Sequence, residues 1–403
     1  MASFFSDVPI CPPNSILGVA LECKNDKFAG KVDLTLGAYR NDGGQPEVLS
    51  SVRDAEKAIY EAQLDHEYLS QDGLPEFTRL SQVLMFGADS PALQEQRVFT
   101  IQGISGTGSL RLAADFLASF LRGKKVFIPD TTWGNHPAIV EASRLEQGTY
   151  RYLDGSGCRL DFSGLLEDLK SAPNGSVVLL HACAHNPTGV DPTDAQWREI
   201  MAVCQDKQLL PWFDNAYQGF VSGDPEVDAF AVRLFVASGF EAIVCCSFAK
   251  NFGLYGERCG CLHFVAQSPA LLPPVASQLR AISRTLYSTC PAHGARIVAT
   301  ILGDPVRKAQ WLRDCHAMAE RLNGVRRRLF DELTARNVKG DWKHVVEQRG
   351  MFSYTGIDAI TVSRLKTDHH IYMLGNGRIS LAGLNSDNVG PFVEALAEIL
   401  GRN

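Results

Sequence analysis

Short apolar runs alternate with helix-length segments between residues 97 and 265. Each run has the length of a buried strand, and together they are Val98–Gln102, Val126–Pro129, Val177–Ala182, Leu209–Phe213, Ile243–Ser247 and Cys261–Val265. Helical stretches such as Ser109–Leu121 and Ala195–Gln205 lie between several of them. A sheet that is covered on both faces buries both sides of every strand, so its strands are continuously apolar. The pattern predicts an α/β fold with a mostly parallel sheet covered by helices.

A different pattern in the last quarter of the chain predicts a second, smaller α+β domain. Apolar residues recur at helical spacing from Trp311 to Leu333, which predicts a long connecting helix. Beyond it, Phe352–Thr355 and Ile379–Ala382 resemble short strands, and a turn signal precedes the second of them. The chain has 403 residues. At about 100–200 residues per domain, that length also predicts more than one domain.

The N-terminal region predicts an extended arm and no targeting peptide. Pro9, Pro12 and Pro13 favour an extended arm over residues 1–14, because proline fixes φ and lacks the backbone N–H of a helix. Such an arm often packs on a neighbouring subunit, although a frayed terminus is the simpler interpretation. The first basic residue is Lys24 and no long apolar stretch precedes it, so a cytoplasmic protein is the default expectation.

Composition and charge narrow the class of protein. The chain is 45% hydrophobic and 21% charged, which argues against a disordered, collagen-like or coiled-coil protein. Its net charge of −6 offers no basic surface for nucleic acid or an anionic membrane, and no apolar run approaches the roughly 20 residues of a membrane-spanning helix. The 11 cysteines include no C-x-x-C pair, and most are interpreted as small core residues of a reducing compartment.

Ligands of an open parallel sheet bind beyond the carboxyl ends of its strands, so the residues just after each predicted strand are the candidates for ligand contacts. After the first strand come glycines and hydroxyl residues, from Gly103 to Ser109, leading directly into a helix. Backbone N–H groups beside glycines, the helix dipole and hydroxyls can together cradle a phosphate. The run matches neither the Walker A nor the G-x-G-x-x-G motif, and a glycine-rich turn with a serine cap explains it equally well.

The second and third strand ends carry an aromatic side chain and two histidines. Trp133 could stack on a flat ring or act as a buried anchor. Asp130 lies about 20 residues beyond the glycines, which leaves a nicotinamide dinucleotide site open. His181, Cys183 and His185 share one face of a strand, as zinc ligands would. No convincing fourth ligand accompanies them, so we expect packed, hydrogen-bonded histidines and no metal.

The remaining strand ends carry Asn186, Asp214 and Lys250. Asn186-Pro187 is a turn candidate that would fix the amide at the mouth of its strand. A carboxylate that closes an apolar run, as Asp214 does, is costly unless it meets a cation. Lys250 could have a lowered pKa and act as a nucleophilic amine, unless it simply pairs with Asp214. Together with the cradle and Trp133, these residues meet the needs of a pyridoxal phosphate enzyme, whereas a dehydrogenase needs no such lysine.

The segment Ser247–Arg258 closely resembles the lysine motif of the aspartate aminotransferase family, in its eukaryotic cytosolic/mitochondrial and enterobacterial branch. The resemblance covers nearly the whole chain, and its other motifs are Leu36–Arg40, Asp65–Leu69, Ser105–Gly108, His185–Gly189, Phe213–Gly219 and Gly377–Ser380. It implies a fold-type I homodimer with active sites at the subunit interface. It also implies a large cofactor-binding domain of residues 47–315 and a small domain of residues 15–46 and 316–403.

The resemblance implies a role toward pyridoxal 5'-phosphate for each matching residue. Lys250 would bond covalently to this cofactor and later move the proton, and Asp214 would pair with its ring nitrogen. Trp133 would stack on the ring, while Tyr217 and Asn186 would bond its phenolate oxygen. The residues that would hold the phosphate are Ser105, Gly106, Thr107, Ser247, Arg258 and, from the other subunit, Tyr68.

The resemblance also implies how substrate binds. Arg378 would grip the α-carboxylate, and Arg284 would cross from the other subunit to the side-chain carboxylate, since guanidinium presents a planar fork to carboxylates. Gly37, Trp133 and Asn186 would complete the substrate site. The expected reaction is ping-pong transamination of amino and keto dicarboxylic acids, L-aspartate plus 2-oxoglutarate to oxaloacetate plus L-glutamate.

Two departures from the family pattern leave a broader activity open. Gly134 stands where relatives commonly carry proline, and Ser288–Pro291 replaces a common Ser-Asn-Pro-Pro. Both changes would lie near the rim of the pocket, so a broad-specificity aspartate/aromatic amino acid aminotransferase is the alternative. A binding or scaffold protein is disfavoured because the lysine and its partners are all present.

Overall fold

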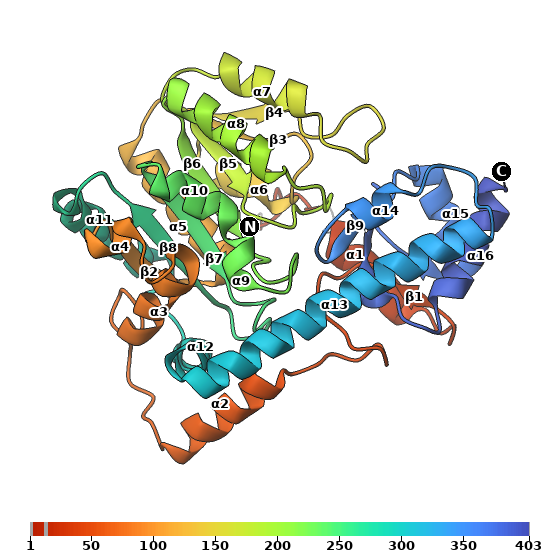
Figure 1. The fold of residues 1–403 in the computed structure, drawn as a ribbon, viewed down its shortest axis with the longest axis horizontal. Coiled ribbons are helices and arrows are strands. Elements are labelled where there is room, and N and C mark those ends of the chain that lie inside the picture. Colours follow the sequence, from red (N-terminus) through yellow and green to blue (C-terminus); the bar gives the residue numbers. More distant parts are fainter. Residues whose placement is uncertain (1–2, 12–14, 403) are drawn as a thin grey trace.

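A seven-stranded sheet forms the centre of the structure, a computed structural model that describes residues 3–11 and 15–402 (Figure 1). Its strands are β2 (Val98–Ile104), β3 (Val126–Pro129), β4 (Gln147–Tyr150), β5 (Val177–His181), β6 (Leu210–Asn215), β7 (Ala242–Ser247) and β8 (Cys259–Val265). They lie in the order β2-β8-β7-β6-β5-β3-β4, and only β8 runs against its neighbours. The predicted α/β fold with a mostly parallel sheet is confirmed.

Helices cover both faces of this sheet, and the inner strands send alternate side chains into two apolar cores. Val178 and Leu180 pack into one core, whereas Val177 and Leu179 pack into the other. This two-sided burial explains why the strands are continuously apolar in sequence. The helices around the sheet are α2 (Ser50–Glu61), α3 (Pro75–Phe86), α4 (Pro91–Gln94), α5 (Ser105–Phe120), α6 (Asn135–Ala142), α7 (Phe162–Ser171), α8 (Asp194–Asp206), α9 (Pro225–Asp228), α10 (Phe230–Ala237), η1 (Pro269–Leu271), α11 (Leu272–Leu286) and α12 (Ala292–Gly303).

The two ends of the chain form a second group of elements, at the right of Figure 1. In it, β1 (Val32–Asp33) pairs parallel with β10 (Ile371–Tyr372), and β9 (Phe352–Tyr354) pairs antiparallel with β11 (Arg378–Ser380). Its helices are α1 (Ser15–Asn25), α14 (His344–Glu347), α15 (Ala359–His369), η2 (Leu381–Gly383) and α16 (Val389–Leu400). The 31-residue helix α13 (Pro305–Ala335) contacts α2 and α12 of the first group and α14 and α16 of the second.

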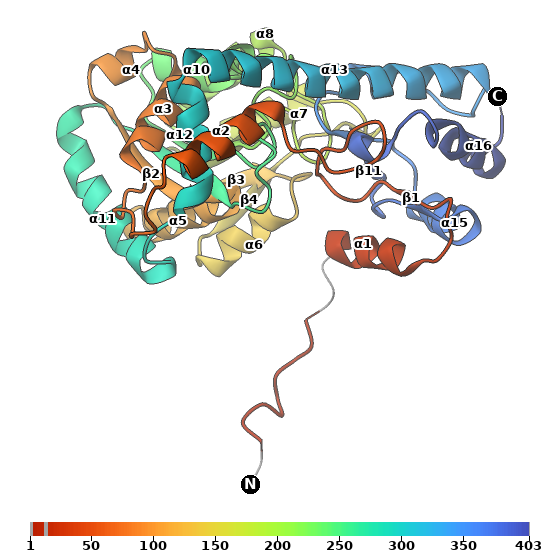
Figure 2. The same ribbon diagram turned by 90° about the horizontal axis from the view of Figure 1, so that it is seen from below.

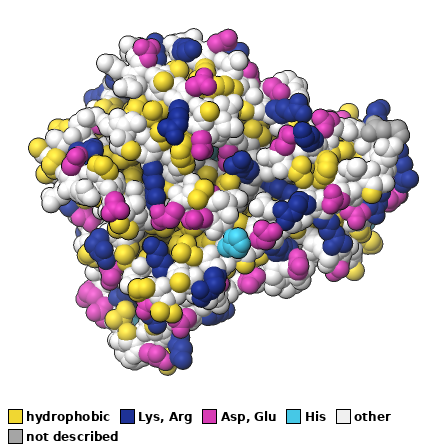
Figure 3. All heavy atoms as spheres, in the orientation of Figure 1, with side chains coloured by type: hydrophobic (Ala, Val, Ile, Leu, Met, Phe, Trp, Pro, Cys, Tyr) yellow, Lys and Arg dark blue, Asp and Glu magenta, His cyan; other side chains and the backbone are white. Residues whose placement is uncertain are grey.

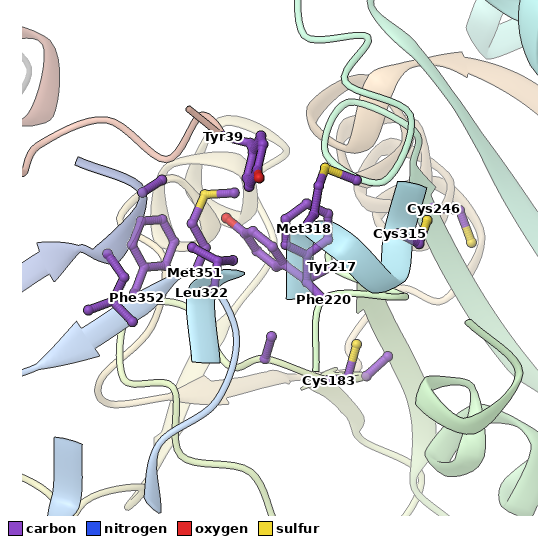
Figure 4. Packing of buried hydrophobic residues seen from close by; sticks show 14 of the residues in the cluster. Tyr39, Cys183, Tyr217, Phe220, Cys246, Cys315, Met318, Leu322, Met351 and Phe352 are labelled. Carbon is purple, nitrogen blue, oxygen red and sulfur yellow. The ribbon is translucent and has the colours of Figure 1, made fainter. Parts of the chain in front are cut away.

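The two groups share one apolar core. Tyr39 and Phe352 of the second group pack in the same buried cluster as Tyr217 of the first (Figure 4). The expected domain boundary at residue 316 falls inside α13, which continues through it without interruption. The division into a large and a small domain at that residue therefore stays a prediction.

The structure changes three predicted elements. Helix α5 begins at Ser105 rather than Ser109, because the left-handed backbone of Ser105 (φ 57°) turns the chain directly from β2 into the helix. Strand β4 is absent from the predicted set, since it is an edge strand whose side chains are mostly exposed or half-buried and form no apolar run. Leu381 and Ala382, predicted to end a strand, begin the 3-10 helix η2 instead.

One face of the molecule shows how its charged side chains are distributed. Basic and acidic side chains are interspersed over the face drawn in Figure 3. Residues 3–11 extend away from the body of the protein, with Phe4 and Ile10 almost fully exposed (Figure 2). Pro12 and Pro13, on which the predicted arm also depended, lie outside the described residues. No helix in the described part of the chain has the length and apolarity to cross a membrane.

Helix α13 anchors the loop after β7. The indole of Trp311 is fully buried and stacks on Phe252, with ring centroids 4.5 Å apart and planes 16° from parallel. Its Nε1–H donates to the backbone oxygen of Asn251 at 2.8 Å. Because Asn251 directly follows Lys250, this contact fixes the position of the lysine-bearing turn against the longest helix.

We expect Trp311→Ala to lower the free energy of unfolding by about 3–5 kcal/mol, because it removes a fully buried aromatic side chain and leaves a cavity. Val306→Ala in the same helix is the control, since Val306 is 77% exposed and its loss should change stability by less than about 0.5 kcal/mol. Urea unfolding of both variants measures the difference. If Trp311→Ala and Val306→Ala changed the free energy of unfolding equally, the anchoring role of Trp311 would be contradicted.

Candidate active site

A cavity of about 180 Å³ opens where β2, β6 and β7 end. Its lining contains every predicted cofactor and substrate residue except Tyr68 and Arg284. The predicted residues that line the cavity are Gly37, Ser105, Gly106, Thr107, Trp133, Asn186, Asp214, Tyr217, Ser247, Lys250, Arg258 and Arg378. The cavity lies at the carboxyl ends of the strands, the edge to which the parallel topology directs ligands.

One end of the cavity has the features of a phosphate site. The first turn of α5 supplies Ser105, Gly106 and Thr107, so the N–H groups and positive dipole end of a 16-residue helix point into it. The Ser105 and Ser247 hydroxyl oxygens lie 3.0 Å apart, and Arg258 adds a guanidinium. A side chain at Gly260 would meet the Ser105 Cα at 2.7 Å, so only glycine lets β8 approach this turn so closely.

Asp214 lies at the deep side of the cavity, near the end of β6. Its side chain is buried, and Oδ2 lies 3.0 Å from Nε2 of His136. Burial alone would raise the pKa of Asp214, but the hydrogen bond from His136 and the electrostatic influence of His136, His181 and Lys250 outweigh burial and lower it. Oδ1 has no hydrogen-bond partner among the described residues. An ionised carboxylate with one unsatisfied oxygen therefore faces the site.

A hydrogen-bond relay orients this carboxylate, and its members are Asn186, His181, Thr132 and His136. The Asn186 backbone N–H lies 3.4 Å from His181 Nδ1, and His181 Nε2 lies 2.9 Å from the Thr132 hydroxyl. The same hydroxyl lies 2.8 Å from His136 Nδ1. A backbone N–H can only donate and a carboxylate can only accept, so with neutral histidines every bond between them points from Asn186 toward Asp214.

This direction is satisfied with both histidines neutral. His181 accepts at Nδ1 and donates from Nε2 to Thr132, which in turn donates to His136. Burial lowers the pKa of His181 well below its usual value, and the nearby charge of His185 adds to this effect. The sequence alone assigns no role to Thr132 and His136, although both lie in the run after the second strand. Only the structure shows that they reach Asp214.

Lys250 lies on the turn after β7, and its Nζ is 5.1 Å from the centre of the Tyr217 ring. Burial lowers the pKa of Lys250, and the positive charge of Arg258 lowers it further, while Asp214 raises it. The net shift is downward, so more of the amine is neutral at a given pH. The Asp214 carboxylate pairs with His136 rather than with Lys250. Asp214 and Lys250 are therefore free for separate roles.

Arg378 is a buried cation held by an aromatic ring. Its guanidinium lies 4.2 Å from the centre of the Phe352 ring, and Nη2 donates to the backbone oxygen of Thr35. Burial lowers the pKa of Arg378 to about 10, so it stays charged at neutral pH. A side chain at Gly37 would come within 2.6 Å of Phe352, which explains why glycine is required beneath this platform. Nε has no partner among the described residues.

The remaining predicted residues frame the cavity. Asn186 precedes a cis peptide bond to Pro187, and its side-chain Oδ1 is buried without a partner in the described part of the chain. Trp133 packs edge-on against His136 with ring centroids 5.2 Å apart. Burial raises the pKa of Tyr217, so its hydroxyl is protonated and can donate. These groups present a ring surface and polar atoms to the same space.

The other candidate residues lie away from this cavity. Tyr68 is 85% exposed and Arg284 is also exposed, so neither joins the cavity. Strand β5 ends at His181, and His185 stacks on Tyr152 at 3.7 Å rather than facing a shared ligand site. Asp130 accepts from the backbone N–H of Tyr152, a structural role that removes the basis for a dinucleotide site.

The sequence matches a known family over most of its length. Residues 29–396 match the family model "Aminotransferase class I and II". Aspartate aminotransferase 1 of Medicago sativa is 48% identical over 401 residues, which cover 99% of this chain and 96% of the relative. Further relatives carry cytoplasmic, chloroplastic or mitochondrial in their names. The chain belongs to the class I and II aminotransferases, which are pyridoxal-phosphate-dependent enzymes.

Two solved structures agree with this assignment. The cytoplasmic aspartate aminotransferase of Saccharomyces cerevisiae superposes with a TM-score of 0.96, at 43% identity and 98% coverage of both chains. The aromatic-amino-acid aminotransferase of Burkholderia pseudomallei, covalently bound to pyridoxal phosphate, gives a TM-score of 0.96 at 40% identity, covering 99% of this chain and 100% of that one.

The residues of this chain fit pyridoxal phosphate. The unsatisfied Oδ1 of Asp214 requires a hydrogen-bond donor, and a protonated pyridine nitrogen supplies one. The helix N-terminus, paired serines and Arg258 suit its phosphate. Lys250 has the lowered pKa that a nucleophilic amine needs. The fit therefore includes the phosphate, the ring nitrogen and the reactive carbon.

We expect Thr132→Val to reduce kcat/KM about tenfold, because losing a hydrogen bond worth about 1.4 kcal/mol leaves His136 and Asp214 less well oriented. Thr131→Val is the matched control, since no hydrogen bond of the Thr131 hydroxyl to the relay is present among the described residues. Steady-state kinetics and the dissociation constant of the cofactor measure the effect. Identical values for the two variants would show that the relay is not needed.

Proposed function

We propose that the chain catalyses reversible transamination, converting L-aspartate and 2-oxoglutarate into oxaloacetate and L-glutamate by a ping-pong mechanism. The observation that carries this proposal is one cavity that holds a buried carboxylate, a lysine of lowered pKa and a buried arginine. The names of the most similar relatives support aspartate as the donor. The first product leaves before the second substrate binds.

One set of residues binds the phosphate of the cofactor, a second binds its ring, and Lys250 serves the reacting carbon. Ser105, Gly106, Thr107, Ser247 and Arg258 hold the phosphate through N–H groups, hydroxyls and a guanidinium. Bound pyridoxal phosphate supplies an electron-withdrawing ring, which makes the proton on the substrate α-carbon removable.

The ring end depends on Asp214, which keeps the ring nitrogen protonated because its ionised carboxylate is oriented by His136. Tyr217 and Asn186 would donate to the phenolate oxygen, and Trp133 would cover one face of the ring. These contacts would hold the ring in one orientation in the cavity that Lys250 also lines.

Lys250 moves the proton. Its amine is neutral over a wider pH range than an exposed lysine, because burial lowers its pKa. The neutral Nζ would take up the proton that leaves the substrate α-carbon and hold it for return within the same site. Nζ of Lys250 lies 5.1 Å from the centre of the Tyr217 ring. The ring therefore limits the directions in which Nζ can move.

Arg378 binds the α-carboxylate. Its guanidinium is already desolvated and lies over the Phe352 ring, so binding needs little further ordering of the side chain. The buried Nε lacks a partner among the described residues, and one carboxylate oxygen of the substrate would provide it. A buried, fixed cation of this kind favours an amino acid over an amine.

We expect Lys250→Ala to lose both the yellow colour of the bound cofactor and at least about a thousandfold of kcat, because no other amine can replace it. The visible spectrum of the purified protein and a coupled oxaloacetate assay measure the two effects. Lys124→Ala, on the surface loop before β3, is the control and should retain both. A coloured, active Lys250→Ala enzyme would disprove the assignment.

The substrates are small amino and keto acids, as the aminotransferase family implies. We infer a homodimer with shared active sites, in which Tyr68 of the partner subunit reaches the phosphate and Arg284 of the partner subunit reaches the side-chain carboxylate. Two observations support it: both side chains are exposed, and residues 3–11 carry apolar side chains into solvent. We further propose a cytoplasmic location, although relatives of three compartments match.

We expect Arg284→Asp to lower kcat/KM for aspartate by roughly 10–100-fold, because one charged hydrogen-bonded pair contributes about 1.5–3 kcal/mol. A hybrid dimer that combines a Lys250→Ala subunit with an Arg284→Asp subunit should recover about half of the wild-type activity, since one of its sites is intact. Co-expression with two different tags isolates the hybrid. An inactive hybrid would place Arg284 in the site of its own subunit.

A broad aspartate/aromatic aminotransferase is the second candidate. It is favoured by the 40% identity and TM-score of 0.96 with an aromatic-amino-acid aminotransferase. Adding aspartate and phenylalanine separately to the yellow enzyme discriminates the two functions. Loss of colour with aspartate alone supports the narrow function, and loss with both amino acids supports the broad one.

A further inference from the structure

Three buried side chains outside the active-site cavity form a cluster of metal-ligating groups. Cys246 lies on β7, and Cys261 and His263 lie on β8. Cys246 and Cys261 are direct cross-strand partners, and His263 is two residues further along the same face. Their ligand atoms all lie within 4.8 Å of one another, the one group of three or more of this kind in the described part of the chain.

The histidine of this cluster is already oriented. Nδ1 of His263 lies 2.7 Å from the Thr100 hydroxyl, and Nε2 lies 3.3 Å from the sulfur of Cys261. Histidines that bind metals show this arrangement, in which the ring nitrogen away from the metal is held by a hydrogen bond. Gln82 donates to the same Thr100 hydroxyl at 2.8 Å, so the ring orientation is fixed from a second residue.

A fourth soft ligand lies beside the cluster. The thioether sulfur of Met85 is 3.8 Å from the Cys246 sulfur. Cys261 and His263 are fully buried and Cys246 is 5% exposed, so water is excluded as a competing ligand. Two thiols, an imidazole and a thioether are the ligand types that select thiophilic metals.

We propose that Cys246, Cys261 and His263 bind one zinc ion at a structural site, with the sulfur of Met85 next to the fourth position. Zn–S and Zn–N bonds of about 2.3 and 2.0 Å place tetrahedral ligands about 3.5–3.8 Å apart, which small side-chain rotations reach from the observed spacing. Binding releases the two thiol protons to solvent. Two thiolates then neutralise Zn²⁺, whereas monovalent copper would leave a buried net charge.

The proposed site lies directly behind the active site. Cys246 precedes Ser247 of the phosphate site, and Asn215 follows Asp214. Nδ2 of Asn215 lies 3.2 Å from the sulfur of Met85 and 3.7 Å from that of Cys246. A zinc ion here would connect β7 and β8 to α3, and thus hold the strand ends that carry the cofactor residues. The sequence alone predicts no metal.

The test measures zinc in the cofactor-bound enzyme after expression in zinc-supplemented medium and dialysis against a chelator. We expect about one zinc ion per chain in the wild type. Cys246→Ala and Cys261→Ala should each retain less than about a tenth of it, because the remaining ligands bind weakly. Cys259→Ala is the matched control: it truncates a buried thiol on the same strand, outside the cluster, and should keep the zinc.

A second measurement needs no variant. X-ray absorption at the zinc edge of the wild-type enzyme should show sulfur neighbours at about 2.3 Å and a nitrogen neighbour at about 2.0 Å. The proposal is overturned by a metal-free wild type, by copper in place of zinc, by equal zinc in all variants, or by a shell of oxygen and nitrogen alone. A mass two hydrogens lower, from a Cys246–Cys261 disulfide, would also overturn it.

Discussion

The buried carboxylate of Asp214 is the group on which the arrangement of the active site depends. An ionised carboxylate at the end of an apolar strand loses its hydration, and His136 satisfies only one of its two oxygens. The other oxygen needs a donor, which a protonated ring nitrogen would provide. In the proposed function, the interaction that activates the cofactor would therefore also complete the hydrogen bonding of this buried charge.

The strand end that carries Asp214 is supported from both sides. On one side, the hydrogen bonds through Thr132 and His136 connect a backbone N–H to the carboxylate, and with neutral histidines they all point toward it. On the other side, Asn215 contacts Gln218 and the sulfur of Met85. Contacts on opposite faces of β6 thus hold the strand end that carries the carboxylate.

Much of the fold and most of the site could be predicted from sequence, for one physical reason. A parallel sheet covered on both faces has strands that are apolar throughout, so the polar residues after each strand mark the ligand-binding edge. Asp214 and Lys250 were found in this way. The start of α5 at Ser105 was missed because it depends on one left-handed residue, and β4 was missed because an edge strand needs no apolar run.

The hydrogen-bond relay and the thiol cluster could not be predicted, because both depend on register. Cys246 and Cys261 are neighbours only because β7 and β8 pair in that alignment, and nothing in their sequence spacing indicates it. Thr132 likewise meets His181, 49 positions away, only after folding. Family resemblance assigned roles to residues that contact a ligand, and gave none to residues that act through another side chain.

Charge explains which parts of the substrate one chain can bind. The protein is acidic overall, with a net charge of −6, yet its cavity contains Lys250, Arg258 and Arg378. Burial lowers the pKa of Lys250 and Arg378, so each anion that binds there offsets a desolvation cost already present in the fold. In the proposed function, Arg258 would bind the phosphate and Arg378 the α-carboxylate. No further arginine lines the cavity among the described residues, so selectivity for a second carboxylate requires a cation from outside it, which is the role proposed for Arg284 of the partner subunit.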